Sequence, residues 1–219
     1  MPDGSLLSRL MAALLNVVAP PNCAACANAA PERLGFCAGC GQPKPAPPTE
    51  IAGVPIIAGS LYEGPLVPAI QAFKYSRRAE LAPTLANLVR PHTQGLELLP
   101  QDAWVPVPLH PRRLAERGYN QSALLARELS RGRSARYLPR LIARRSATLQ
   151  QAALKRSDRA SNVRNAFVVR GKERPGRVVL VDDVVTTGAT VTACVDALAS
   201  AGIPVLAIVA VARALPSSG

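Results

Sequence analysis

Four of the five cysteines occur as two Cys-x-x-Cys pairs, Cys23 with Cys26 and Cys37 with Cys40. Two close thiolate pairs can surround a soft divalent ion, so the spacing predicts a structural zinc site with no open position for catalysis. A module of about 25 residues is too small to fold without such a metal. Two disulfides or a redox-active Cys-x-x-Cys pair are the alternatives. No secretory context supports disulfides, and a redox-active pair would not need a second cysteine pair beside it.

A second group of chemistry-bearing residues lies in the segment VVLVDDVVTTGAT, residues 178–190. Its apolar start predicts a buried strand that places Asp182 and Asp183 at its C-terminal end, where ligands bind in open α/β sheets. The following residues open a helix, whose amides and hydroxyls suit a phosphate: Thr186, Thr187, Gly188, Ala189 and Thr190. Gly188 lets the backbone approach the anion closely.

Carboxylates beside a phosphate site repel the phosphate unless the ligand also offers them hydroxyls or a bridging cation. A phosphorylated ribose meets both requirements. The alternative is a strand, turn and helix with solvated acids, which leaves the two carboxylates and the threonine-rich loop without a role.

The spacing of apolar residues along the chain predicts the strands and helices that must position these groups. Strands are predicted at 54–62, 104–108, 178–181 and 205–211. Helices are predicted from a stripe of Leu66, Val67, Ile70 and Phe73, over 81–89, over 121–129 with Asn120 as N-cap, and from Val191 to a stop at Gly202. The alternation predicts an α/β fold with a parallel sheet flanked by helices, with Cys194 in its core.

Length and composition fit one ordinary domain with a small appendage. The chain has 219 residues, 48% of them hydrophobic and 18% charged, which excludes a disordered protein and a large multidomain assembly. We expect an amphipathic helix over 1–20, a small zinc-ribbon-like module and proline-rich linker over 21–48, and the main domain over 49–215. The apolar stripe of the first helix is shorter than a membrane span and makes a weak signal peptide, so we expect a cytoplasmic protein.

The net charge of +12 is concentrated in one block. Residues 112–177 carry 18 Lys and Arg against 4 Asp and Glu, whereas the other 153 residues carry 8 against 10. Such a block favours an electropositive surface with a phosphate-bearing partner. The alternative is that scattered arginines only keep the surface soluble.

The acidic pair and threonine loop resemble the phosphoribosyl-pyrophosphate motif of type I phosphoribosyltransferases. The resemblance implies that Asp182 and Asp183 hold the ribose hydroxyls and that residues 186–190 hold the 5'-phosphate. A longer set of motifs resembles the ComF family, phosphoribosyltransferase homologues linked to DNA uptake in competent bacteria. These are WVPVPLHPRRLAERGYNQ from Trp104 to Gln121, FKY from Phe73 to Tyr75, Thr148 with Gln150, Arg159 with Asn162 before Phe167, and the cysteine pairs.

The resemblance implies further roles. Arg112, Arg113, Arg117 and Lys74 are expected to neutralise the pyrophosphate, with magnesium bridging pyrophosphate and ribose oxygens. The stretch 144–164 is expected to form a mobile loop that closes over the site. Single-stranded DNA and DNA-uptake proteins are the expected macromolecular partners, and the oligomeric state stays open.

Three functions are compatible with these features. The first is magnesium-dependent phosphoribosyl transfer. Transferases for 6-oxopurines carry an acid two positions before the loop glycine, where this chain has Thr186, so purine salvage is disfavoured. The second is single-stranded DNA binding through the basic block, and the third is a sensor that binds phosphoribosyl pyrophosphate without turnover. Helicase action is not supported, because the chain has no G-x-x-x-x-G-K-[ST] loop.

Overall fold

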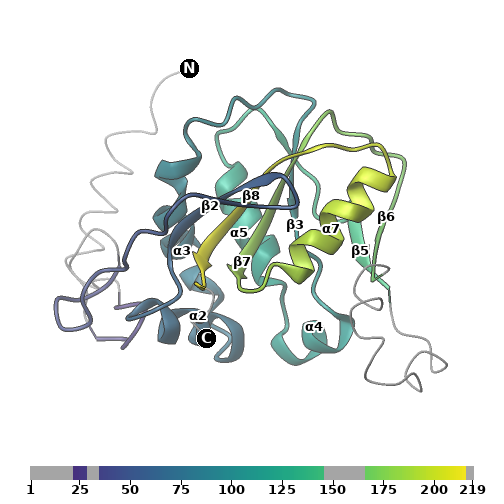
Figure 1. Ribbon diagram of the computed structural model, residues 1–219. Coiled ribbons are helices and arrows are strands. Elements are labelled where there is room, and N and C mark those ends of the chain that lie inside the picture. The colour runs from purple at the N-terminus through teal and green to yellow at the C-terminus, as the bar shows by residue number, and fades with distance from the viewer. Residues whose placement is uncertain (1–21, 29–34, 146–165, 216–219) are drawn as a thin grey trace, which may run out of the picture.

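The computed structural model describes residues 22–28, 35–145 and 166–215 (Figure 1). The expected N-terminal helix over 1–20 lies outside these ranges. So do Thr148, Gln150, Arg159, Asn162 and most of the expected mobile loop over 144–164.

A six-stranded sheet in the order β1-β2-β8-β7-β3-β4 forms the centre of the molecule. Its strands are β1 (Thr49–Ile51), β2 (Val54–Leu61), β3 (Ala103–Pro106), β4 (Arg136–Tyr137), β7 (Val178–Val185) and β8 (Val205–Arg213). Neighbours pair in parallel, except that β1 is antiparallel to β2. Two further strands, β5 (Ile142–Arg144) and β6 (Phe167–Val169), pair antiparallel with each other. The expectation of a mostly parallel α/β sheet is confirmed.

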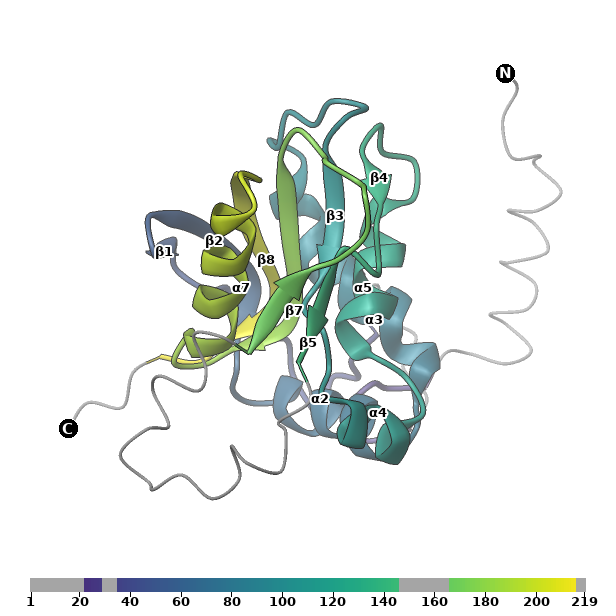
Figure 2. The same ribbon diagram turned by 90° about the vertical axis from the view of Figure 1, so that its right-hand side faces the viewer.

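Helices cover both faces of the sheet (Figure 2). They are α2 (Leu66–Tyr75), α3 (Ala82–Val89), α4 (Pro111–Arg117), α5 (Gln121–Ser130) and α7 (Ala189–Ser200), with single 3₁₀ turns η1 (Ala79–Leu81) and η2 (Arg90–Thr93). Strand β7 is buried on both sides because its side chains alternate between the two faces. Val179 and Val181 belong to the core under α3 and α5, whereas Val178 and Leu180 belong to the core under α7.

Strand β7 continues four residues beyond the predicted end at Val181. It stays paired with β8 as far as Val185, which lies opposite Arg213. Both acidic residues are therefore part of the strand and share its rigidity. Periodicity also missed β1, β4, β5, β6 and α4, because elements of two to seven residues are too short to show a period.

Other local predictions are confirmed. The Asn120 side chain accepts a hydrogen bond from the amide of Ser122 and caps α5. Phe73 and Cys194 are fully buried. These positions were predictable because helix caps and apolar stripes depend on residues within a few positions of one another.

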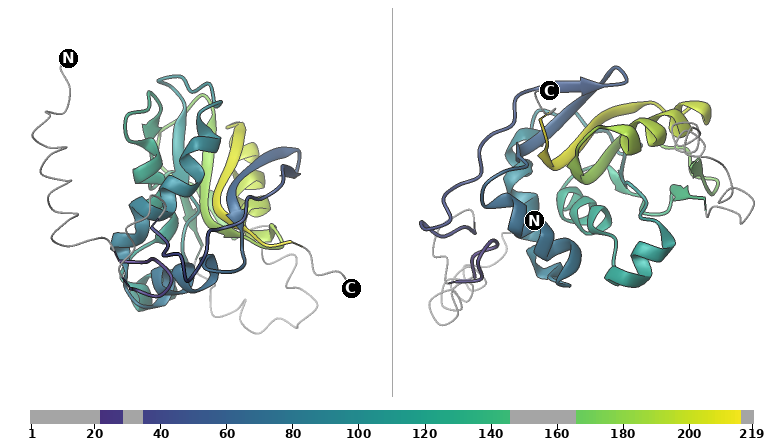
Figure 3. Two further views of the ribbon diagram at one scale, coloured as in Figure 1. Left: turned by 90° about the vertical axis from the view of Figure 1, so that its left-hand side faces the viewer. Right: turned by 60° about the horizontal axis from the view of Figure 1, so that its bottom comes forward.

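The connections between strands define a point in the sheet on either side of which the chain moves in opposite directions. From β3 the chain passes through α5 to β4 at the sheet edge, whereas from β7 it passes through α7 to β8 on the other side. Helices α5 and α7 lie on opposite faces (Figure 2). The carboxyl ends of β3 and β7 therefore flank the switch point where open α/β sheets bind ligands. The right view of Figure 3 turns this edge toward the viewer.

The cysteine-bearing segments join the same core as the sheet. Cys23, Ala24 and Phe36 are fully buried in the cluster that contains α3 and α5. Gly35 adopts a φ of +74°, and a Cβ there would meet the methyl group of Thr84 in α3. The proline-rich segment is also fixed to the body, because the carbonyl of Lys44 accepts hydrogen bonds from the β2 residues Ser60 and Leu61.

Candidate functional site

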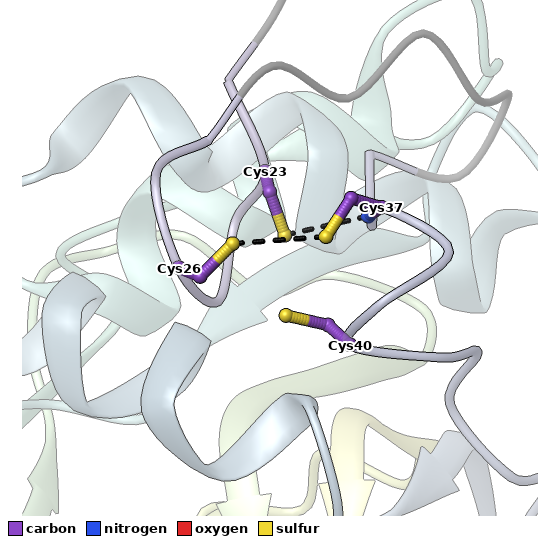
Figure 4. A group of neighbouring side chains, drawn as sticks. All are labelled: Cys23, Cys26, Cys37 and Cys40. Atoms are coloured by element: carbon purple, nitrogen blue, oxygen red, sulfur yellow. Dashed lines mark hydrogen bonds between the residues drawn. The ribbon is translucent and has the colours of Figure 1, made fainter.

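The four paired cysteines converge on one point (Figure 4). Their sulfur atoms all lie within 4.8 Å of one another, and Cys26 Sγ lies 3.7 Å from Cys37 Sγ. Within the described ranges this is the one group of three or more His, Cys, Asp or Glu side chains that could hold a metal ion. Cys23 is fully buried, while Cys26 is exposed.

The thiols cannot all ionise without a cation. Burial raises the pKa of Cys23, but hydrogen bonds from the backbone amides of Cys26 and Cys37 outweigh it and lower that pKa to about 6. Hydrogen bonds with Cys26 and Cys37 raise the pKa of Cys40 to about 12. Four sulfur donors gathered this closely match the ligand set of tetrahedral zinc.

The acidic pair of β7 draws its partners from two helices. Lys74 Nζ, at the end of α2, lies 2.9 Å from Asp183 Oδ1. Ser122 Oγ, in the first turn of α5, donates to Asp182 Oδ1 at 2.9 Å, and the backbone amide of Asp183 donates to the same oxygen at 2.9 Å. Among the described residues, nothing bonds the other oxygen of either carboxylate. Each acid is thus held by one oxygen and keeps one oxygen for a ligand.

The two carboxylates differ electrostatically. Burial raises the pKa of Asp182 to about 7, and the negative charge of Asp183 adds to this rise. The hydrogen bond from Ser122 and the charge of Lys74 oppose it. Asp183 instead has a direct cation partner. Asp182 can therefore hold a proton near neutral pH, so it offers a ligand a protonatable acid.

The loop after β7 leads directly into α7. Gly188 is the N-cap with a φ of +80°, and Thr187 Oγ1 accepts a long hydrogen bond of 3.5 Å from the amide of Ala189. A small cavity of about 40 Å³ is lined by Asp182 and residues 184–191, which include the predicted phosphate residues Thr186, Thr187, Gly188, Ala189 and Thr190. A Cβ at Gly188 would meet the side chain of Ile51 in β1, so packing against β1 also requires this glycine.

The arginines predicted for pyrophosphate occupy two environments. Arg112 and Arg113 lie exposed on α4, and Arg112 pairs with Glu116 at 3.0 Å. Arg117 is only 8% exposed, and its guanidinium lies 4.8 Å from the centre of the Tyr75 ring. Lys74, the fourth predicted cation, lies against the acidic pair.

Two side chains to which the sequence assigned no role fix the end of α2. Tyr119 Oη and Gln121 Nε2 both donate to the carbonyl of Phe73, at 2.6 and 3.4 Å. These contacts hold Lys74 in reach of Asp183. Tyr119 and Gln121 lie within the ComF-like stretch, which was the available signal for them. No signal pointed to Ser122, because its partner lies 60 residues away in the sequence.

A larger groove of about 1000 Å³ lies between α4, the start of α5, β5 and the segment that follows β6. Most of its lining is apolar, with Leu114 and Leu141 among the contributors. Arg140, Arg144 and Arg170 also line it, and within the described ranges none of them pairs with a carboxylate. Burial lowers the pKa of Arg144, as does the nearby charge of Arg113. The groove therefore combines apolar walls with three arginines that make no ion pair within the described ranges, and with one carboxylate, Glu173, which pairs with Arg136.

Across the described ranges, we find no helix with the length and apolar character needed to cross a bilayer.

Comparison with known proteins identifies relatives over most of the chain, although no family model matches it. The chain is 36% identical over 188 residues to DNA utilization protein YhgH of Escherichia coli O6:H1, covering 77% of this chain and 80% of the relative. It is 35% identical over 188 residues to the YhgH protein of Salmonella typhimurium, with the same coverage. It is 37% identical over 166 residues to competence protein F of Haemophilus influenzae, covering 73% of this chain and 72% of the relative. With identities this high over this much of both chains, and with the paired cysteines gathered as a metal site, the chain belongs to the ComF family.

Proposed function

We propose that this chain has the type I phosphoribosyltransferase fold and binds phosphoribosyl pyrophosphate at the carboxyl edge of β7. Asp182 and Asp183 hold the ribose hydroxyls through their unbonded oxygens. Residues 186–190 hold the 5'-phosphate through the amides at the start of α7. The observation that carries the proposal is the direct succession, at the sheet's switch point, of two carboxylates and an amide-rich helix start.

The pyrophosphate part of the ligand lies toward α2 and α4 in this proposal. Lys74 neutralises charge beside the acids, and Arg112, Arg113 and Arg117 are the guanidinium groups within the α4 segment. Guanidinium and ammonium groups suit phosphate oxygens. Magnesium bound with the ligand would neutralise charge on the pyrophosphate leaving group.

Phosphoribosyl transfer is the reaction that this site would support. A nucleophilic acceptor attacks the anomeric carbon, its bond to that carbon forms, and the bond to pyrophosphate breaks. Thr186 stands where 6-oxopurine enzymes carry an acid, so this loop supplies no carboxylate to deprotonate an acceptor. We therefore propose an acceptor that is nucleophilic without such a base. The same pocket would serve a sensor that binds the ligand without turnover.

Thermal unfolding with and without phosphoribosyl pyrophosphate and Mg²⁺ tests ligand binding. A ligand at a hundredfold its dissociation constant adds about 2.7 kcal/mol to the free energy of unfolding. We expect this gain in the wild type and its loss in Asp182→Asn/Asp183→Asn. Asp196→Asn, an exposed acid on α7, is the matched control and should keep the gain. No gain in the wild type would refute the proposal.

We further propose that the protein acts in DNA uptake or utilization, because its relatives are named DNA utilization protein and competence protein F. The cysteine cluster would hold a structural zinc ion, because all four donors come from protein and the buried Cys23 and Phe36 tie the cluster to the core.

The groove supports a second candidate function, single-stranded DNA binding. Its three arginines without carboxylate partners offer guanidinium groups to phosphates beside apolar walls. Binding should weaken steeply with salt, because each neutralised phosphate releases counterions.

Fluorescence anisotropy of a labelled oligothymidylate across a salt series measures this interaction. Arg140→Ala and Arg170→Ala should each weaken binding and lower the salt slope by about 1. Arg112→Ala is the matched control, because Arg112 is already paired with Glu116. Binding that is absent or independent of salt would remove this candidate.

A further inference from the structure

The groove beside α4 exposes apolar side chains on rigid walls. Figure 2 faces α4, α5 and β5, the elements that border it. Leu114 of α4 lines the groove and is 43% exposed, and Leu109 is half-buried beside it. Pro108, Pro111 and Pro139 also line the groove, and their fixed φ angles make these walls rigid. Apolar side chains exposed in a preformed groove are typical of a binding surface.

The same groove gathers cations that repel one another. Arg140 and Arg170 are exposed at it, and Arg144 is half-buried with its guanidinium 5.4 Å from the centre of the Phe167 ring. Within the described ranges none of the three makes an ion pair. Burial and the charge of Arg113 on α4 lower the pKa of Arg144. Cations held together beside an apolar surface favour an anionic partner.

Single-stranded DNA accounts for only part of this lining. Its phosphates would pair with the arginines, but among the described residues no aromatic side chain lines the groove, so a base finds no ring to stack on. The leucine and proline walls would then have no partner. A protein segment that carries both carboxylates and apolar side chains matches both parts of the lining.

The chain itself does not supply the acids that these arginines require. The carboxylate in the groove lining, Glu173, pairs with Arg136 at 2.6 Å. Residues 146–165, which connect β5 to β6 in the sequence, carry four Lys and Arg against one Asp. A second copy of the chain has a net charge of +12 and would be repelled. Charge complementarity therefore favours a different, acidic protein.

We infer that the groove binds a short segment of another protein in which acidic side chains alternate with apolar ones. The apolar side chains of this segment lie against Leu109 and Leu114, and its carboxylates pair with Arg140, Arg144 and Arg170. The apolar contacts supply most of the affinity, while the ion pairs set orientation and specificity. The inference goes beyond the proposed ligand binding and depends neither on phosphoribosyl pyrophosphate nor on DNA.

Panning a displayed library of random dodecapeptides against the wild-type protein tests this inference. The variant Leu114→Ser/Arg140→Glu serves for counter-selection, because it removes one apolar contact and reverses one charge on exposed side chains. We expect the enriched peptides to combine Asp or Glu with Leu, Ile, Val or Phe. An absence of enrichment, or enriched peptides that are basic, lack apolar residues or bind the variant equally well, would overturn the inference.

Fluorescence anisotropy of an enriched peptide then measures the single contacts. Leu114→Ser and Arg140→Glu should each weaken binding by about tenfold, the effect of losing a central side chain of an interface. Leu99→Ser and Arg127→Glu are the matched controls, because both side chains are exposed and neither lines the groove. The controls should bind the peptide as the wild type does, and equal losses in all four variants would contradict the inference.

Two further measurements distinguish the other occupants. Oligothymidylate that binds Leu114→Ser as tightly as the wild type, while the peptide binds only the wild type, supports the inference, because phosphates do not need the apolar wall. Binding of oligothymidylate but of no peptide would assign the groove to DNA. In sedimentation velocity, a wild-type dimer that becomes monomeric in Leu114→Ser would assign the groove to a second copy. Either of these assignments overturns the inference.

Discussion

The cysteine cluster and the acidic pair of β7 both gather groups that repel one another when ionised. The cluster draws its sulfur atoms from two short neighbouring segments, and within the described ranges no Lys or Arg is among the groups that shift the pKa of Cys23 or Cys40. The acidic pair receives Lys74 from α2 and Ser122 from α5. The cluster is therefore local in sequence and dependent on an added ion, whereas the acidic pair depends on the whole fold and is partly neutralised by it.

Losing a cysteine should give the largest effect, because it would remove one of the four ligands of the proposed zinc ion. We expect Cys26→Ser to lose bound zinc and at least about 3 kcal/mol of stability. For a chain of this size that lowers Tm by about 10 °C. Metal analysis and calorimetry measure both changes.

Cys194→Ala is the matched control for this prediction. It also removes a thiol, but from the buried face of α7, so it should lose some packing and keep the zinc. Wild-type protein that carries no zinc, or whose Tm is unchanged by a chelator, would contradict the prediction.

Removing Lys74 tests whether the fold neutralises the acidic pair. Lys74→Met leaves Asp183 largely buried without its counter-ion, so we expect a loss of about 1–3 kcal/mol in denaturant unfolding at pH 7. Adding Asp183→Asn should restore most of the lost stability, because the uncompensated charge is then gone.

Arg112→Met is the control for the ion pair. It breaks the exposed pair with Glu116 and should change stability by less than about 0.5 kcal/mol. Equal losses of stability in Lys74→Met and Arg112→Met would mean that Lys74 of α2 does not stabilise the acidic pair.

Gly188→Ala tests the dependence of the phosphate loop on β1. The backbone at φ +80° disfavours a side chain, and the new Cβ would meet Ile51, so we expect a loss of about 1–2 kcal/mol. Ile51→Ala in the same chain should relieve the contact but not the backbone strain. Gly95→Ala, where a Cβ has open space, should be close to neutral in the same thermal unfolding assay.

The pH dependence of stability tests the protonation of Asp182. The pKa of Asp182 is about 7 in the fold against 3.8 ordinarily, so the native state binds more protons between these values and stability falls as pH rises through this range. Asp182→Asn should flatten this slope in Tm measured from pH 4.5 to 8. The pKa of Asp102 is lowered by Arg177 despite burial, so its stabilisation is lost only at lower pH. An unchanged slope in Asp182→Asn would assign the effect to another group.

The sequence alone determined the features whose parts are close together in the chain. The cysteine donors, the acidic pair with its loop, the helix cap at Asn120 and the long strands and helices all follow from spacing or period over a few residues. Such patterns are predictable because one turn or one strand fixes the relative positions of their members.

Only the tertiary structure decided which groups face the acids and which arginines stay without partners. The basic block contains both arginines that pair with acids, such as Arg136 with Glu173 and Arg177 with Asp102, and the arginines of the groove. The contact of Lys74 with Asp183 and that of Arg117 with Tyr75 each join separate helices or strands. These contacts depend on how α2, α4 and α5 pack around the sheet, and packing is set by the burial of the whole core and not by any local pattern.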